Sequence, residues 1–139
     1  MKRHRIIILG FALWALGMLA ASCSSPDPAI SKVDGMYVVD TSLIEDNDIQ
    51  GFKGPTPILV YIKDGSVVKV ERKGEWKEGQ RHIDRVFEGI GHSWDGKSLS
   101  EAGDSEVDAV SGSTFTSKGL IENVNLALEY YMSKKKGRK

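Results

Sequence analysis

The chain has 139 residues, 40% of them hydrophobic and 27% charged, with 19 basic against 19 acidic side chains. Three basic residues lie near the N-terminus and five near the C-terminus, so the remaining body holds 11 basic against 19 acidic residues, which argues against a nucleic-acid-binding surface. The single cysteine, Cys23, excludes an intramolecular disulfide and a cysteine-based zinc or iron–sulfur site.

Residues 1–22 have the pattern of a lipoprotein signal peptide. Three basic residues precede an uncharged run over 6–21, which is shorter than the about 20 apolar residues of a membrane-spanning helix and ends in small residues. Cys23 follows, and its position resembles the lipobox of bacterial lipoproteins, in which the cysteine is lipidated and becomes the new N-terminus. Leu19 lies one residue further from the cysteine than the usual leucine, which leaves an uncleaved anchor or an ordinary signal peptide as alternatives. In each case we expect the rest of the chain in the cell envelope, facing the periplasm or the exterior.

The remaining sequence divides into three parts. Residues 23–33 are rich in Ser, Pro, Asp and Ala and lack apolar periodicity, which indicates a flexible tether. Residues 34–133 form one predicted domain, since about 100 residues can bury one core but not two. Residues 134–139 are a basic tail, for which we expect either a frayed, solvated end or a contact with anionic lipid or a partner.

Hydrophobic patterning predicts an antiparallel sheet in the first half of this domain. A β-branched and aromatic run predicts a strand over 36–39. Residues 58–62 and 67–71 are two further β-rich runs, and the Asp64-Gly65 pair between them favours a tight hairpin turn with positive φ. Residues 41–50 are polar and acidic and predict a loop.

Two amphipathic helices follow. Apolar residues at helical spacing predict a helix over 80–90, and the sequence then passes through a turn and a polar segment to an extended stretch over 107–110. A second amphipathic stripe predicts a helix over about 116–132. This order predicts an α+β fold, a small single domain in which helices pack against an antiparallel sheet.

Five hydroxyl side chains surround Gly112 in the stretch Asp108 to Ser117, directly before the second helix. A helix N-terminus offers unpaired N–H groups and the positive end of the helix dipole, so N–H groups near residues 115–117 are suited to hold a phosphate. The same residue types also serve as ordinary N-caps. No histidine follows Thr114, and a nucleophile elbow, a P-loop, a dinucleotide fingerprint and a metal-ligand cluster are absent from the sequence. His82 we expect to be solvated.

The heptapeptide from Asp108 to Thr114 resembles the flavinylation motif of the FMN-binding domain family, usually written Asp-x-x-Ser/Thr-Gly-Ala-Thr. That family includes the C and G subunits of sodium-pumping and related quinone or ferredoxin oxidoreductases, and many exported lipoproteins. The resemblance implies that a flavin transferase, using FAD and Mg²⁺ and releasing AMP, esterifies FMN phosphate to Thr114. It implies that Asp108 is the acidic residue that the transferase requires and that Gly112 makes the turn. Ser113 stands where alanine is usual and adds a competing hydroxyl.

Three outer pieces of the sequence agree with this family in type and order. They are its opening Gly-x-Tyr strand, its Gly-aromatic-x-Gly-Pro turn and its hairpin, represented here by Asp34-Gly35-Met36-Tyr37, Gly51-Phe52-x-Gly54-Pro55 and Asp64-Gly65. Trp94 and Phe115, with Tyr61, are candidates to stack on the flavin ring. The predicted FMN-binding residues are Thr114, Ser113, Gly112, Ser111, Asp108, Phe115, Thr116, Ser117 and Trp94.

We therefore expect a lipid-anchored flavoprotein that relays electrons outside the cytoplasm between redox partner proteins. It is an electron carrier rather than a stand-alone enzyme, since the flavin carries the redox chemistry and the chain positions it. Two alternatives stay open. One is a lipoprotein that binds a phosphorylated or anionic ligand without a covalent bond, and the other is an accessory subunit that scaffolds a membrane complex.

Overall fold

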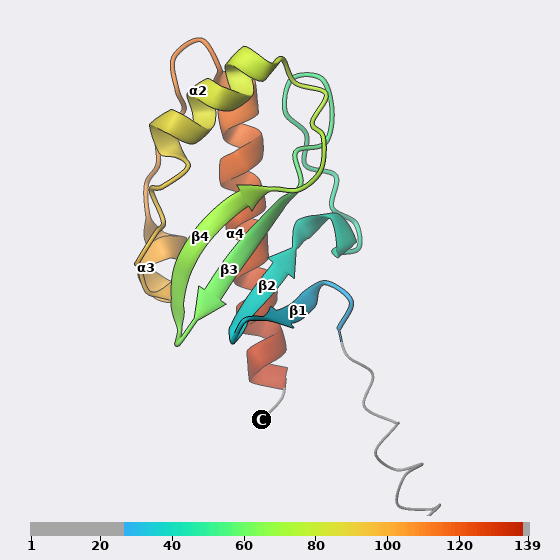
Figure 1. The fold of residues 1–139 in the computed structure, drawn as a ribbon, viewed down its shortest axis with the longest axis vertical. Helices are drawn as coiled ribbons and strands as arrows, with labels where there is room; N and C mark the ends of the chain where they lie inside the picture. Colours follow the sequence, from blue (N-terminus) through green and yellow to red (C-terminus); the bar gives the residue numbers. More distant parts are fainter. Residues whose placement is uncertain (1–26, 138–139) are drawn as a thin grey trace, which may run out of the picture.

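A computed structural model describes residues 27–137. The predicted signal peptide, the predicted lipidation site at Cys23 and the last two residues of the basic tail lie outside the described residues. Within residues 27–137 no helix is long and apolar enough to cross a membrane. The described strands form one antiparallel sheet in the order β1-β2-β3-β4 (Figure 1): β1 (Ile30–Val33), β2 (Met36–Asp40), β3 (Ile58–Lys63) and β4 (Ser66–Arg72).

Asp-Gly pairs form the turns of both hairpins. Asp64 and Gly65 have φ of 51° and 75° and join β3 to β4, as predicted, because two successive left-handed residues match the twist of the strands they connect. Asp34 and Gly35 have φ of 51° and 79° and join β1 to β2 in the same way. The structure thus corrects the end of the predicted tether: the ordered domain does not begin at this turn, because the turn pairs β2 with a preceding strand.

The helices are α2 (Gln80–Ile90), α3 (Leu99–Asp104) and α4 (Thr114–Gly137), with a 3-10 helix η1 (Thr41–Leu43) in the predicted loop. The bounds of α2 are those predicted. α3 lies in the segment predicted to be irregular, where the Ser98 hydroxyl accepts a hydrogen bond of 3.2 Å from the Glu101 N–H and caps the helix. α4 continues past the predicted end at residue 132 to Gly137, so residues 134–137, which are four of the six residues of the basic tail, are helical rather than a frayed end.

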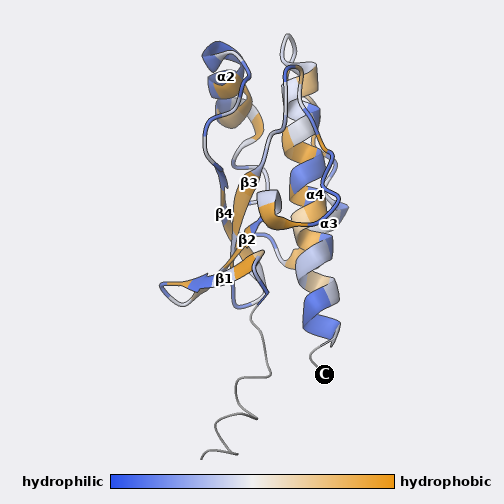
Figure 2. Ribbon diagram, turned by 90° about the vertical axis from the view of Figure 1, so that its right-hand side faces the viewer, coloured by the Kyte–Doolittle hydropathy of each residue, from blue (hydrophilic) through white to orange (hydrophobic). Residues whose placement is uncertain are grey.

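The core lies between the sheet and α4, which runs along one face of the sheet (Figure 2). Each buried aliphatic side chain of this core contributes about 2 kcal/mol to the stability of the fold. The packing of the helix against the antiparallel sheet confirms the predicted α+β fold. α2 contributes to the same core beside the N-terminal half of α4. Side chains at most 1% exposed in this core include Val39, Ile58, Val60, Ile62, Leu120, Val124 and Leu128.

A buried amide connects α4 to the loop that precedes β3. The Asn123 Nδ2 donates to the Thr56 carbonyl oxygen at 2.8 Å and to the Gly119 carbonyl oxygen at 2.9 Å, while its Oδ1 accepts from Asn47 Nδ2 at 3.1 Å. Asn123 is fully buried, so these partners offset its desolvation. The loop over 44–56 is therefore held against the first turns of α4.

Candidate functional site

The N-terminus of α4 presents backbone donors without intrahelical acceptors. Ser117 makes the first helical bond there, from its N–H to the Ser113 carbonyl oxygen at 2.9 Å. The N–H groups of residues 114–116 therefore have no acceptor within the helix. Gly112, two residues before the helix, has φ of 81°, a conformation that glycine adopts without strain. The chain thus turns sharply and directs its first helical turn outward.

Two of the hydroxyls in the predicted site are buried and hydrogen-bonded to distant segments. Ser113 is 4% exposed, and its Oγ lies 2.8 Å from Nδ1 of His82 on α2. Thr116 is 3% exposed and donates a hydrogen bond of 3.0 Å to the carboxylate of Glu78. These two hydroxyls hold the loop to neighbouring elements.

The remaining hydroxyls separate into one buried and two exposed. Ser117 is fully buried, donates to the Ser113 carbonyl oxygen at 2.7 Å and accepts from the Val110 N–H at 3.0 Å, so it closes the turn. Thr114 is exposed, and in the described part of the chain no side-chain hydrogen bond involves it. Ser111 is exposed too but does not line the pocket that Thr114 lines. Thr114 is therefore the accessible hydroxyl of the first helical turn.

A shallow pocket of about 210 Å³ opens beside Thr114. Phe52 and Phe115, 69% and 59% exposed, form an apolar wall, with their ring centroids 5.8 Å apart. Pockets that enclose a small-molecule ligand usually hold about 300–1,000 Å³, so a ligand as large as a flavin would lie mostly on the surface against these rings. The lining consists of Phe52, His82, Gly112, Ser113, Thr114, Phe115 and Thr116.

Glu78 fixes the position of the Phe52 turn on α4. Its side chain is 5% exposed and accepts hydrogen bonds from the Phe52 N–H, from the Lys53 N–H at 2.7 Å and from the Thr116 hydroxyl. A Cβ added at Gly51 would overlap Glu78 Oε1, which explains glycine at this position. Three donors compensate the buried carboxylate, so the turn and the helix N-terminus are held as one unit.

α2 brings positive charge to the same loop. A Cβ built on Gly112 would lie 2.8 Å from an Nη atom of Arg85, so the guanidinium lies directly beside this glycine. His82 and Arg85 are three residues apart and share one face of α2. Together with the positive end of the α4 dipole, they make this edge of the pocket suited to an anion.

The structure gathers most of the predicted site residues and separates one. Residues 112–116 line the pocket, Ser117 lies directly beneath it, and Asp108 and Ser111 are exposed in the loop before it. Trp94 is 1% exposed in the hydrophobic core and does not line the pocket, because a large aromatic side chain at a tight turn is stabilised most by burial. Tyr61, the other ring candidate outside the motif, hydrogen-bonds Glu71 on the sheet instead.

Sequence reasoning missed four contributors to the site: Phe52, Glu78, His82 and Arg85. Phe52 had a signal, because it occupies the aromatic position of a glycine-rich turn. His82 and Arg85 are solvent-exposed, as their position on the polar face of an amphipathic helix predicts, but that pattern does not predict their contact with the loop of Gly112 and Ser113. Glu78 has no distinguishing pattern in the sequence.

Comparison with known proteins covers both the Phe52 turn and the loop before α4. A family model described as the FMN-binding domain matches residues 51–129, more than half of the chain. The matched segment includes the Phe52 turn, Glu78, α2 and the loop before α4. No curated protein and no solved structure matches the chain.

Proposed function

The chain belongs to the FMN-binding domain family, as the sequence motif predicted, and we propose that it carries FMN covalently as a phosphoester of Thr114. The observation that carries the proposal is the contrast among neighbouring hydroxyls. Thr114 is exposed, while Ser113, Thr116 and Ser117 are buried and hydrogen-bonded. Ser113, the departure from the family motif, is therefore a poor competitor for attachment.

Attachment requires a group transfer at the Thr114 oxygen. Thr114 Oγ1 would attack the FMN phosphorus of FAD held by a flavin transferase with Mg²⁺. The pyrophosphate bond would break, AMP would leave with the electron pair, and the hydroxyl proton would pass to a base. Asp108, Ser111 and Gly112 are exposed in the loop before α4, which gives the transferase access. Asp108 is exposed and available to contact the transferase, in keeping with the role that the family motif implies.

The residues around Thr114 fit a phosphate diester. Three N–H groups of the first helical turn and the α4 dipole favour a negative charge there. Arg85, beside Gly112, supplies a permanent positive charge, and His82 a further hydrogen-bonding ring at 2.8 Å from Ser113. These groups would hold the phosphate and orient the rest of the ligand.

The exposed phenylalanines fit the isoalloxazine ring. Phe52 and Phe115 lie next to Thr114 and offer aromatic faces for stacking. When bound, FMN supplies the electron-transfer chemistry. A ring on an open surface is reachable by another protein, so we propose a carrier between a membrane donor and an exported acceptor. We also propose that the export signal and lipidated Cys23 retain it at the membrane outside the cytoplasm.

The test is the intact mass and visible absorbance of the protein after coexpression with a flavin transferase. The wild type should gain one FMN that stays with the denatured chain. Thr114→Ala should gain none, whereas Ser113→Ala, which restores the usual family residue, should be flavinylated like the wild type. A flavin released by denaturation would instead support the lipoprotein that binds an anionic ligand reversibly. A flavinylated Thr114→Ala variant would move the attachment to another hydroxyl.

A further inference from the structure

We propose that the end of the domain farthest from Thr114 lies against an anionic lipid surface, so that the FMN site faces away from the bilayer. We call this end the basic pole and define it by Lys32, Lys134, Lys135 and Lys136. The proposal rests on the membrane tether of the proposed function and is independent of the flavin.

The start of the described chain is fastened to this pole. The Tyr130 hydroxyl lies 2.8 and 2.7 Å from the two carboxylate oxygens of Asp27, and Lys134 Nζ lies 3.6 Å from the same carboxylate. Asp27 also accepts a hydrogen bond of 2.9 Å from the Ala29 N–H. The segment that arrives from the predicted anchor is therefore held at the last turns of α4.

The length of chain before Asp27 then limits how far this pole can be from the membrane. Cys23 precedes Asp27 by four residues, which span at most about 14 Å. An uncleaved anchor ending at residue 21 would allow about 20 Å. Both forms of anchor place the C-terminal end of α4 near the bilayer, while Thr114 lies about 30 Å away along the helix.

Charge favours the same orientation. The last turn of α4 carries Lys134, Lys135 and Lys136, and Arg138 and Lys139 follow in the sequence. The rest of the body has an excess of acidic residues. An anionic surface attracts the first group and repels the second, which orients the domain with its basic pole toward the lipid.

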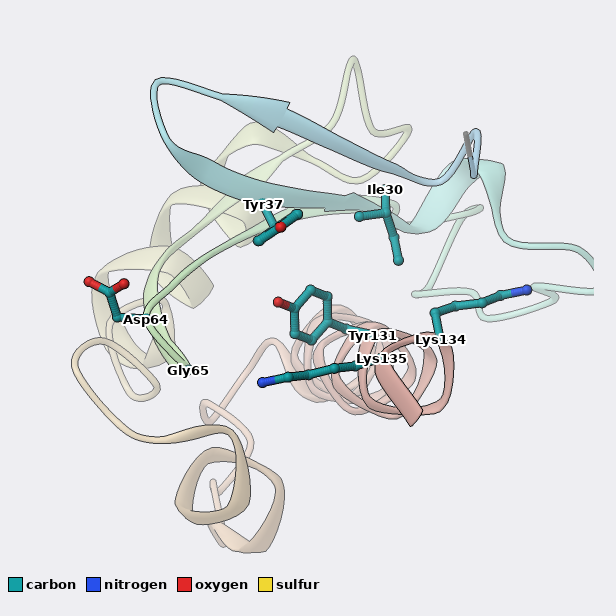
Figure 3. A pocket seen from close by; sticks show the side chains of 7 residues that line it. All are labelled: Ile30, Tyr37, Asp64, Gly65, Tyr131, Lys134 and Lys135. Carbon is teal, nitrogen blue, oxygen red and sulfur yellow. The ribbon is translucent and has the colours of Figure 1, made fainter. Parts of the chain in front are cut away.

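A cavity of about 520 Å³ at this pole suits a lipid headgroup. Figure 3 shows Tyr131 extending from α4 toward the strand that carries Tyr37, and Lys135 extending from α4 toward the turn of Asp64 and Gly65. The two tyrosine rings lie 5.8 Å apart between centroids, and Lys32 Nζ lies 5.6 Å from the Tyr37 ring. Lysine ammonium groups and tyrosine hydroxyls are donors for a phosphate oxygen, and tyrosine is enriched at membrane interfaces. Asp64 is the acidic residue of the lining and lies at the rim with Gly65.

This orientation limits how electrons reach the flavin. With Thr114 about 30 Å from the pole along α4, an FMN attached there would not meet a carrier dissolved in the lipid. We infer that the membrane donor is a protein whose exposed part reaches the Phe52 and Phe115 face.

The test uses the full-length protein reconstituted in vesicles of phosphatidylcholine, with and without phosphatidylglycerol. A water-soluble acylating reagent labels exposed lysines, and peptide mass spectrometry measures the rate at each position. In the anionic vesicles Lys32 and Lys134–136 should label about fivefold more slowly than in neutral vesicles. High salt should remove the protection, and Lys77 and Lys118 should label at the same rate in both.

Matched charge reversals separate the pole from the rest of the surface. The double variant Lys135→Glu/Lys136→Glu keeps the Lys134 contact to Asp27 and should abolish the protection of Lys32. The control Lys77→Glu/Lys118→Glu should leave it unchanged. Equal labelling of Lys32 in both lipids, or protection of Lys118 instead, would overturn the orientation. Loss of the protein from both vesicles would overturn the tether, while the FMN content, read from the intact mass, tests the attachment separately.

Discussion

The Thr116 hydroxyl, in the first turn of α4, donates a hydrogen bond of 3.0 Å to the carboxylate of Glu78, in the segment between β4 and α2. The same carboxylate binds the backbone N–H groups of Phe52 and Lys53. Three segments far apart in the sequence therefore meet at one buried charge. This arrangement sets the position of Phe52 relative to Thr114.

Replacing this carboxylate should weaken both the fold and the site. Glu78→Gln substitutes an amide donor for one acceptor oxygen, so at least one of the three donors loses its partner. We expect a loss of about 2 kcal/mol in the free energy of unfolding, measured by urea denaturation. Glu75→Gln, an exposed change of the same chemistry, should alter it by less than about 0.5 kcal/mol. Equal effects of the two variants would contradict the role of Glu78.

Close packing of the Phe52 turn on α4 should make Gly119 intolerant of a side chain. A Cβ at Gly119 would lie 2.5 Å from Thr56 Oγ1 and 3.3 Å from Gly51 Cα. Alanine raises helix propensity by about 1 kcal/mol, yet we expect Gly119→Ala to destabilise the protein by about 1–3 kcal/mol because backbone must move. Gly103→Ala, in α3 with no atom within 4 Å of the added Cβ, should be neutral or stabilising in the same thermal unfolding experiment. A stabilised Gly119→Ala variant would contradict this prediction, because it would show that the loop with Gly51 and Thr56 shifts away from α4 at little energetic cost.

Phe52 should hold the flavin ring without being needed for its attachment. In Phe52→Ala one aromatic face of the wall is lost, which removes about 1 kcal/mol of stacking. We expect one FMN per chain by intact mass, as in the wild type, but a lower flavin fluorescence anisotropy because the ring moves more freely. Leu43→Ala, a truncation at an exposed apolar residue outside the pocket, is the control. Unchanged anisotropy in Phe52→Ala would place the ring elsewhere.

The contact of Tyr130 with Asp27 should produce a pH-dependent contribution to stability. Burial and the hydrogen bonds to Asp27 raise the pKa of Tyr130 from 10 to about 12. Because the folded state favours the neutral hydroxyl, this contribution is complete below pH 10 and is lost as the pH rises through 12. Tyr130→Phe should therefore be about 1 kcal/mol less stable than the wild type at pH 7 in urea denaturation. The difference should shrink between pH 10 and 12.

The Asp27 side of this contact responds to acid. Burial raises the pKa of Asp27, but the hydrogen bonds from Tyr130 and the Ala29 N–H and the charge of Lys134 outweigh burial, so the pKa lies below its usual 3.8. The contribution of the Asp27 carboxylate to the free energy of unfolding is therefore present above pH 3.8 and is lost as the pH falls through the lowered pKa. A double-mutant cycle of Asp27→Asn with Tyr130→Phe measures the coupling directly. Additive effects of the two changes would mean that the segment is not held there.

Features that depend on neighbouring residues were predictable from the sequence, whereas contacts between residues far apart in the sequence were not. The sequence predicts the Asp64-Gly65 hairpin, the bounds of α2 and the hydroxyl-rich loop before α4. Each of these features depends on a pattern of residues that are close together in the sequence. The family followed from the same local motif. At Asp34-Gly35 the identical turn signal predicts only a domain start, because the short strand before it has little pattern of its own.

The sequence alone identified Thr114 as the candidate hydroxyl and predicts a lipidation signal before the domain. The tertiary structure decided which hydroxyls are accessible, that Trp94 is buried in the core, and that Phe52, Glu78 and α2 complete the site. The physical reason is that these contacts join residues about 25 to 65 positions apart in the sequence. Packing of α2 and the loop over 44–56 against α4 creates them, and no local pattern specifies which polar residues such packing brings together.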